Sequence, residues 1–333
     1  MEIIIAILSI IIISYLFSFI LFKLLKVPHV VSLIILGLIF GMQPISRLYF
    51  QNSLDHISTL GTIGLFFLMF IAGLKTSWKK LHSEEKDSFA IALFALIIPL
   101  SLGFSVSYIL LDLPFVSSLV IGICMSITAE ATKTQVLIDL KKLNTKVGSA
   151  MIGAGILDDF AGLVLFSAVL FVAGELHYTE YLILFGVLFA FILGMLSKHF
   201  AKEHHLTKKI EFIGTNFFIP FFFVNMGLLF NLGNLEIDLL FVFIILIVAI
   251  IGKLLGTYLA KPYVSFDKKQ LLLIGWGMNS RGAVELALVL MAFNAGLIAT
   301  NTYSALVLMT LVTTAIFPFI ITYIIKNNRS IMN

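Results

Sequence analysis

Two adjacent carboxylates, Asp158 and Asp159, stand within a long apolar segment over residues 146–173. They lie about twelve residues from one end of it, roughly 18 Å along a helix and near the middle of a bilayer. A buried charge there costs about 2.5 to 3.5 kcal/mol, so a sequence does not keep two without compensation. Adjacent helical side chains point about 100° apart. We therefore expect different roles, with one carboxylate facing a water-filled cleft and the other a neighbouring helix.

Lys253, in a second apolar segment over residues 237–260, is the natural counter-charge for these carboxylates. Burial in a low dielectric disfavours the charged form of either group, so such a group can exchange a proton for a cation. One carboxylate with hydroxyls and unwound carbonyls suits a monovalent ion, whereas Ca2+ or Mg2+ needs more oxygen ligands. A salt bridge with a purely structural role is the alternative interpretation of Lys253.

Two further apolar segments, 114–138 and 269–296, combine charge with poor helix formers at membrane depth. Such backbone is tolerated only where it lines a cavity or is buried in protein. The charged residues are Glu130 and Lys133 in the first segment, and Arg281 and Glu285 in the second. We predict two crossing broken helices whose end charges these side chains neutralise. Local pairing within each segment, at i, i+3 and i, i+4, is an alternative that is compatible with the crossing.

The composition identifies the elements that must hold these residues. Of the 333 residues, 60% are hydrophobic and 12% are charged, with a mean hydropathy of +1.09. This excludes a soluble enzyme and predicts an all-α polytopic membrane protein whose surroundings are the lipid bilayer. The net charge of +4 does not indicate nucleic acid, because the basic residues stand between apolar runs. The eleven predicted spans are 3–22, 28–42, 57–74, 88–111, 114–138, 146–173, 179–197, 209–231, 237–260, 269–296 and 300–325.

The basic residues predict the orientation of these spans. Eighteen of them fall in the connections on one side, and Arg47 alone falls on the other. The positive-inside rule then places the N-terminus outside and the C-terminus in the cytoplasm, with the chain in the plasma membrane. The three remaining basic residues, Lys133, Lys253 and Arg281, lie inside spans.

An internal repeat relates the third span to the eighth. Both contain a Gly-Thr pair, a phenylalanine-rich run and a Gly-Leu pair, at offsets of 153 and 154 residues. The two spans are five apart in the count, so they cross the membrane in opposite directions. Shifting the first predicted break by 154 residues lands on the second. These features predict an inverted repeat, as in many secondary transporters.

Two motifs resemble those of the bacterial and archaeal sodium/proton and potassium/proton antiporters of the NapA and Kef type. LNTKVGSAMIGAGILDDFAGLVL, from Leu143 to Leu165, is similar to the paired-aspartate helix of that family. GMNSRGAVEL, from Gly277 to Leu286, resembles its broken helix. The resemblance implies an elevator-type exchanger, in which a core domain moves against a scaffold domain.

The resemblance also implies roles for single residues. By position, Asp159 matches the carrier of cation and proton, and Asp158 matches the acid that pairs with a lysine. Lys253 matches that lysine, and Thr128 matches the hydroxyl at the first helix break. The residues of the two breaks described above then form a supporting charge network.

The same resemblance implies a core domain over approximately 88–173 and 237–326, a scaffold over 1–74 and 209–231, and a linker helix over 179–198. The family usually has thirteen spans, so the scaffold is expected to be shortened by about two helices. A homodimer is expected, and no cofactor. No nucleotide-binding domain follows Arg329, so Kef-style ligand gating would require a separate cytoplasmic regulatory subunit.

These observations together predict a proton-coupled antiporter for Na+ or K+, and not an enzyme. A gated cation channel or efflux component, and a sodium-coupled solute symporter, are alternatives on the same fold. A channel would conduct ions without moving protons, and a symporter would show sodium-driven uptake of a solute. An intramembrane aspartyl protease needs aspartates that face each other from different helices, whereas these two are neighbours on one helix.

Overall fold

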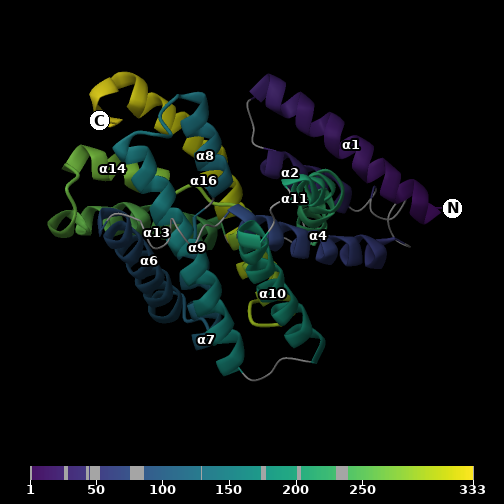
Figure 1. Ribbon diagram of the computed structural model, residues 1–333. Helices are drawn as coiled ribbons and strands as arrows, with labels where there is room; N and C mark the ends of the chain where they lie inside the picture. The colour runs from purple at the N-terminus through teal and green to yellow at the C-terminus, as the bar shows by residue number, and fades with distance from the viewer. Residues whose placement is uncertain are drawn as a thin grey trace. The chain divides into compact units, whose positions relative to one another are not determined.

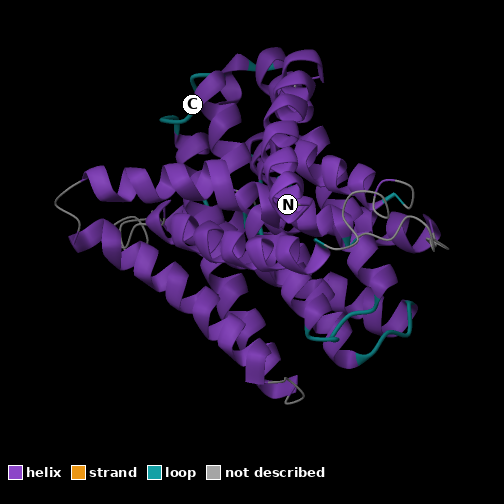
Figure 2. Cartoon of the chain, turned by 90° about the vertical axis from the view of Figure 1, so that its right-hand side faces the viewer, coloured by secondary structure: helices purple, strands orange, loops and turns teal. Residues whose placement is uncertain are grey.

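The computed structural model is all-helical, with no strand among the residues that it describes (Figure 2). This agrees with the predicted fold class. The chain divides into two compact units, each assembled from two separate stretches of sequence. The first unit comprises 1–77 with 182–236, and the second comprises 78–181 with 237–333. The described residues are 2–25, 29–42, 45, 53–75, 86–128, 130–173, 178–200, 204–229 and 239–332.

In the first unit, α12 packs against both α2 and α4, and α1 packs against α2. Gly37 of α2 makes the close approach possible, because a Cβ atom there would lie 2.2 Å from the Val224 carbonyl oxygen of α12. Small residues let membrane helices pack backbone to backbone. The helices of this unit are α1 (Glu2–Leu25), α2 (His29–Gly41), α4 (Leu54–Lys75), α10 (Tyr178–Phe200), α11 (His204–Ile213) and α12 (Ile219–Leu228), with α10 belonging to it from Leu182 onward.

The predicted span over 209–231 is interrupted by a π-helical turn, η3 (Gly214–Phe218), between α11 and α12. Pro220 has no N–H, so the carbonyl of Asn216 lacks its ordinary helical partner. The hydroxyl of Tyr15 in α1 donates to that carbonyl at 3.1 Å and to Asn216 Oδ1 at 2.6 Å. A proline together with a contact from another helix therefore explains a feature that hydropathy does not predict.

In the second unit, α6 packs against α7, α9 and α13, and α13 packs in turn against α14 and α16 (Figure 1). A hydrophobic core gathers Ile91 of α6, Met151 of α9, Ile274 of α14 and Phe317 of α16. The helices of this unit are α6 (Lys86–Ser105), α7 (Phe115–Ser126), α8 (Glu130–Asp139), α9 (Lys146–Ala173), α13 (Leu239–Leu259), α14 (Lys268–Gly277), α15 (Ala283–Asn294) and α16 (Thr300–Asn327), with short turns η2 (Val106–Leu110), η5 (Lys261–Tyr263) and η6 (Arg329–Met332).

Two of the predicted spans are broken helices, as expected from their composition. The first divides into α7 and α8 around Ile127 and Thr128, and the second into α14 and α15 around 278–282. Among the described residues, six helical segments are long and apolar enough to cross a membrane, and further apolar helices, including α7 and α15, are shorter. Half-helices are short because each ends at a break inside the protein.

Candidate functional site

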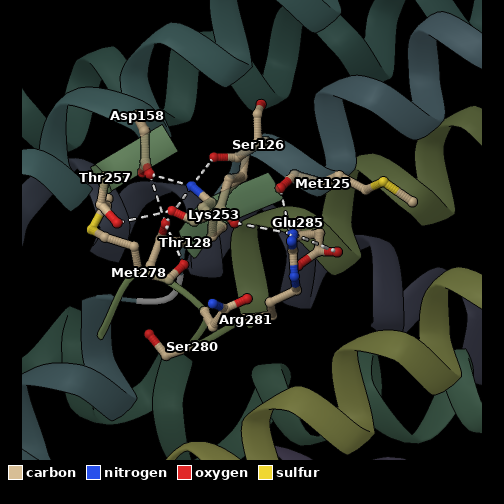
Figure 3. Close-up of polar contacts among 12 residues, drawn as sticks. Met125, Ser126, Thr128, Asp158, Lys253, Thr257, Met278, Ser280, Arg281 and Glu285 are labelled. Atoms are coloured by element: carbon tan, nitrogen blue, oxygen red, sulfur yellow. Dashed lines mark hydrogen bonds and ion pairs between the residues drawn. The ribbon is translucent and has the colours of Figure 1, made fainter. Parts of the chain in front are cut away.

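Asp158 of α9 is fully buried and makes a charged contact with α13. Its Oδ2 atom lies 2.8 Å from Lys253 Nζ, and the hydroxyl of Thr128 donates to the same oxygen at 2.6 Å (Figure 3). Its other oxygen, Oδ1, is buried and has no hydrogen-bond partner among the described residues. Of the two adjacent carboxylates, it is therefore Asp158 that pairs with the lysine.

The ammonium group of Lys253 has no exposed surface, and its three donors are matched by three acceptors. It donates to Asp158 Oδ2, to Thr128 Oγ1 at 2.9 Å and to the carbonyl of Ser126. The last contact places a positive charge at the C-terminal end of α7, where the helix dipole is negative. Lys253 therefore connects α9, α13 and the first helix break.

Asp159 follows Asp158 in α9 but is only partly buried. The two carboxylates have different surroundings because consecutive residues on a helix point in different directions. This matches the expected asymmetry of the pair, while the role of each carboxylate stays a prediction. Of the two aspartates, Asp159 is the more exposed.

The two helix breaks lie against each other, as predicted for crossing broken helices. Thr128 in the first break lies within hydrogen-bonding distance, 3.2 Å, of the carbonyl of Met278 in the second. Gly162 of α9 leaves room for the first break, because a Cβ atom there would lie 2.4 Å from Ile127 Cγ1. Unwound backbone from both helices therefore meets beside the Asp158–Lys253 pair.

The last four carbonyls of α7 cannot form helical hydrogen bonds, and all four receive a side-chain donor. Two of the four donors are contributed by Arg281, whose own backbone belongs to the second break (Figure 3). The carbonyls of Ile123, Cys124, Met125 and Ser126 accept from Ser126 Oγ, Arg281 Nη1, Arg281 Nη2 and Lys253 Nζ respectively. Charged side chains thus neutralise this half-helix end, as the sequence predicts.

The sequence predicts one local charge pair at each break. The structure forms the Arg281–Glu285 pair, whereas the Glu130–Lys133 pair involves a side chain outside the described residues. Arg281 Nη1 lies 3.6 Å from Glu285 Oε1, so the expected i, i+4 pairing is confirmed. Lys133 is fully buried and donates to the carbonyl of Met151 at 2.7 Å. The side chain of Glu130 lies outside the described residues, so its pairing with Lys133 stays a prediction.

The C-terminal end of α14 is capped by side chains that directly follow it in the sequence, whereas three of the four donors at the end of α7 come from distant parts of the sequence. Asn279 Nδ2 donates to the carbonyl of Gly275 at 3.0 Å, and Ser280 Oγ lies 3.2 Å from the carbonyl of Gly277. The sequence does not predict the roles of the Ser126 and Met278 carbonyls, because every residue carries a carbonyl. The side-chain hydroxyls and amides around the breaks are the uncharged groups that residue type does indicate.

The sequence matches the family model described as "Sodium/hydrogen exchanger, transmembrane" over residues 8–189 and 176–327. Among curated relatives, the Na+/H+-K+ antiporter GerN of Bacillus cereus is 26% identical over 350 residues, covering 89% of this chain and 89% of GerN. A Na+/H+ antiporter of Enterococcus hirae is 26% identical over 357 residues, covering 90% of this chain and 92% of that protein.

Among solved structures, the sodium proton antiporter MjNhaP1 of Methanocaldococcus jannaschii at pH 8 superposes with a TM-score of 0.71. The match covers 97% of this chain and 100% of that one, at 17% sequence identity. At this identity the likeness establishes a shared fold.

Proposed function

Because the chain belongs to the sodium/hydrogen exchanger family, we propose that it exchanges a monovalent cation, Na+ or K+, for a proton by alternating access. The similarity to GerN, a Na+/H+-K+ antiporter, and to the Na+/H+ antiporter of Enterococcus hirae supports this choice of ions. The family consists of transporters rather than enzymes, so the protease alternative has no support from it.

Asp159 is the proposed carrier of both ions. It is an intramembrane carboxylate that is only partly buried, and it directly follows Asp158, which accepts a hydrogen bond from Thr128 in the first helix break. A proton and a cation that compete for one carboxylate are coupled without any further device, because binding of one excludes the other. The different burial of the two adjacent aspartates is the observation that carries this proposal.

Asp158, Lys253 and Thr128 form the proposed frame of the ion site. The lysine and the hydroxyl hold one oxygen of Asp158, while Oδ1 stays available as an acceptor for an ion. Backbone oxygens of the two breaks, such as the Met278 carbonyl, are the kind of ligand that broken helices supply to Na+ in transporters.

The second unit is the proposed core domain and the first unit the proposed scaffold. The two-unit division of the chain supports this, since the breaks, the aspartates and Lys253 all belong to the second unit. A homodimer through the scaffold, and a separate cytoplasmic regulatory subunit, are proposed from the family resemblance alone.

The chain is a multi-pass membrane protein, and the plasma membrane is its proposed location. Phe89, Leu93 and Ile97 form an exposed apolar row along α6, one residue in every four, as lipid contact requires. The distribution of loop charges supports an external N-terminus and a cytoplasmic C-terminus.

Purified protein in proteoliposomes with an internal pH-sensitive dye tests the exchange. Addition of Na+, K+ and Li+ in turn to acid-loaded vesicles is expected to raise the internal pH for at least one of Na+ and K+. The Asp159→Asn variant is expected to show no response. A response equal to that of the wild type would remove Asp159 as the carrier, and a cation current without proton movement would favour the channel alternative.

A further inference from the structure

We propose that Arg281 is a positioning residue for ion exchange, and that its guanidinium serves as a tethered cation at the C-terminal end of α7. The inference rests on the exchange function proposed above. It assigns the arginine a task beyond charge compensation of Glu285: holding the first helix break in the arrangement that the ion site needs.

The contacts of the guanidinium are those of a bound cation. Arg281 is fully buried, and its Nη1 atom donates to the carbonyl of Cys124 at 2.8 Å and to that of Ile127 at 3.4 Å. Its Nη2 atom donates to the carbonyl of Met125 at 2.8 Å. A carboxylate, Glu285, lies 3.6 Å from Nη1. Backbone carbonyls at the C-terminal end of a half-helix are the oxygens that coordinate Na+ in broken-helix transporters.

The same helix end sets the geometry of the ion site. Ser126, next to Met125, accepts from Lys253, and Thr128 in the same break donates to Asp158. Without the guanidinium, the carbonyls of Cys124 and Met125 would be buried without donors, which is costly. Lys253 already donates to the carbonyl of the next residue, Ser126, and its withdrawal from Asp158 toward these acceptors would disturb the frame of the site.

Both the backbone carbonyl and the guanidinium of Arg281 have partners in neighbouring helices. The hydroxyl of Thr314 in α16 donates to the Arg281 carbonyl at 2.6 Å, which fixes the second break at this residue. Glu285 lies in the first turn of α15, where a negative charge is also favoured by the helix dipole. Arg281 therefore joins the first break to the second, and the two broken helices are expected to move as one body.

A purely structural ion pair is the competing explanation, and neutralising both partners separates the two. Removing one partner of a buried pair leaves an uncompensated charge, whereas replacing both by apolar residues of similar size is often neutral. If Arg281 only compensates Glu285, the double variant Arg281→Met/Glu285→Met should recover exchange. If Arg281 holds the carbonyls of α7, the double variant should fold and still lack exchange.

The experiment compares exchange rate, apparent KM for the cation and thermal unfolding for wild type, Arg281→Met, Arg281→Lys and the double variant. We expect Arg281→Met and the double variant to lose more than about tenfold in rate. Arg281→Lys keeps a charge within reach of the same carbonyls and is expected to stay within about threefold. Lys326→Met, an exposed basic residue at the end of α16, is the matched control and is expected to behave as wild type.

A folded double variant that exchanges within about threefold of wild type would overturn the inference. A lysine variant that is inactive, or that does not fold, would also overturn it, and this variant decides the question if the methionine variants do not fold. Exchange by the wild type in the same vesicles tests the proposed function separately. An inactive wild type would refute the function, and an active wild type with an active double variant would refute only the role of Arg281.

Discussion

Lys253 and Asp158 lie 95 residues apart in the sequence, and their charged atoms meet at 2.8 Å with no exposed surface on either side chain. The same ammonium group also reaches the Ser126 carbonyl at the end of α7. One ion pair therefore joins three helices at the point where the backbone unwinds. This makes the pair a structural requirement of the site as well as part of its electrostatics.

Replacing Lys253 by methionine should destabilise the protein by about 3 to 5 kcal/mol, because it leaves a buried charge without compensation. Thermal unfolding in detergent measures this loss. The double variant Lys253→Met/Asp158→Asn removes both charges and should recover much of the loss. A double variant that recovers none of the loss would show that the charge is not its cause.

Thr128→Val should raise the apparent KM for the cation by about tenfold while leaving the folded state intact. The change keeps the shape of the side chain but removes the hydroxyl that lies between Asp158 and the Met278 carbonyl. A lost hydrogen bond to a charged group is worth about 1.5 to 3 kcal/mol. Thr313→Val is the matched control, because that buried hydroxyl donates to carbonyls of its own helix, α16. Equal KM values for the two variants would contradict a role for Thr128 in the site.

Gly37→Ala should destabilise the first unit by about 1 to 3 kcal/mol, because the added Cβ atom meets the Val224 carbonyl oxygen at 2.2 Å. Gly41→Ala, one turn further along α2, is the matched control. Its Cβ atom would meet the nearest atom, the Leu228 carbonyl oxygen, at 3.4 Å, which is an ordinary contact. Thermal unfolding of both variants measures the difference. A drop in stability for Gly41→Ala as large as that for Gly37→Ala would contradict the described packing of α2 on α12.

Tyr15→Phe should cost about 1 kcal/mol, since it removes the hydroxyl that satisfies Asn216 at the π-helical turn. Thermal unfolding is again the measurement, with Tyr323→Phe on an exposed part of α16 as the control. Stability equal to that of the control would mean that Tyr15 does not support the turn.

Residue types predicted much of this site because charge is costly in an apolar segment. Asp158, Lys253, Arg281 and Glu285 stand out for that reason, and the glycines and hydroxyls around them indicate the broken helices. The Arg281–Glu285 pair follows from its i, i+4 spacing alone. Side-chain pairs of this kind can be predicted from the sequence because they depend only on neighbouring residues along one helix.

Contacts that depend on the rotation of a helix or on backbone atoms could not be predicted in the same way. Spacing alone does not determine which of Asp158 and Asp159 faces Lys253, and only the family resemblance pointed to Asp158. The Ser126 and Met278 carbonyls are chemically like every other carbonyl in the chain. Their importance comes from helix ends that tertiary packing brings together.

Proton release on cation binding tests the central claim, that one carboxylate serves two mutually exclusive ions. Purified protein in weakly buffered detergent solution is mixed with Na+ or K+, and the pH change is recorded for wild type and for Asp159→Asn. We predict that the wild type releases about one proton per bound cation and that its apparent affinity weakens as the pH falls. The asparagine variant should release none. Equal proton release from the variant, or cation binding that does not depend on pH, would contradict the account.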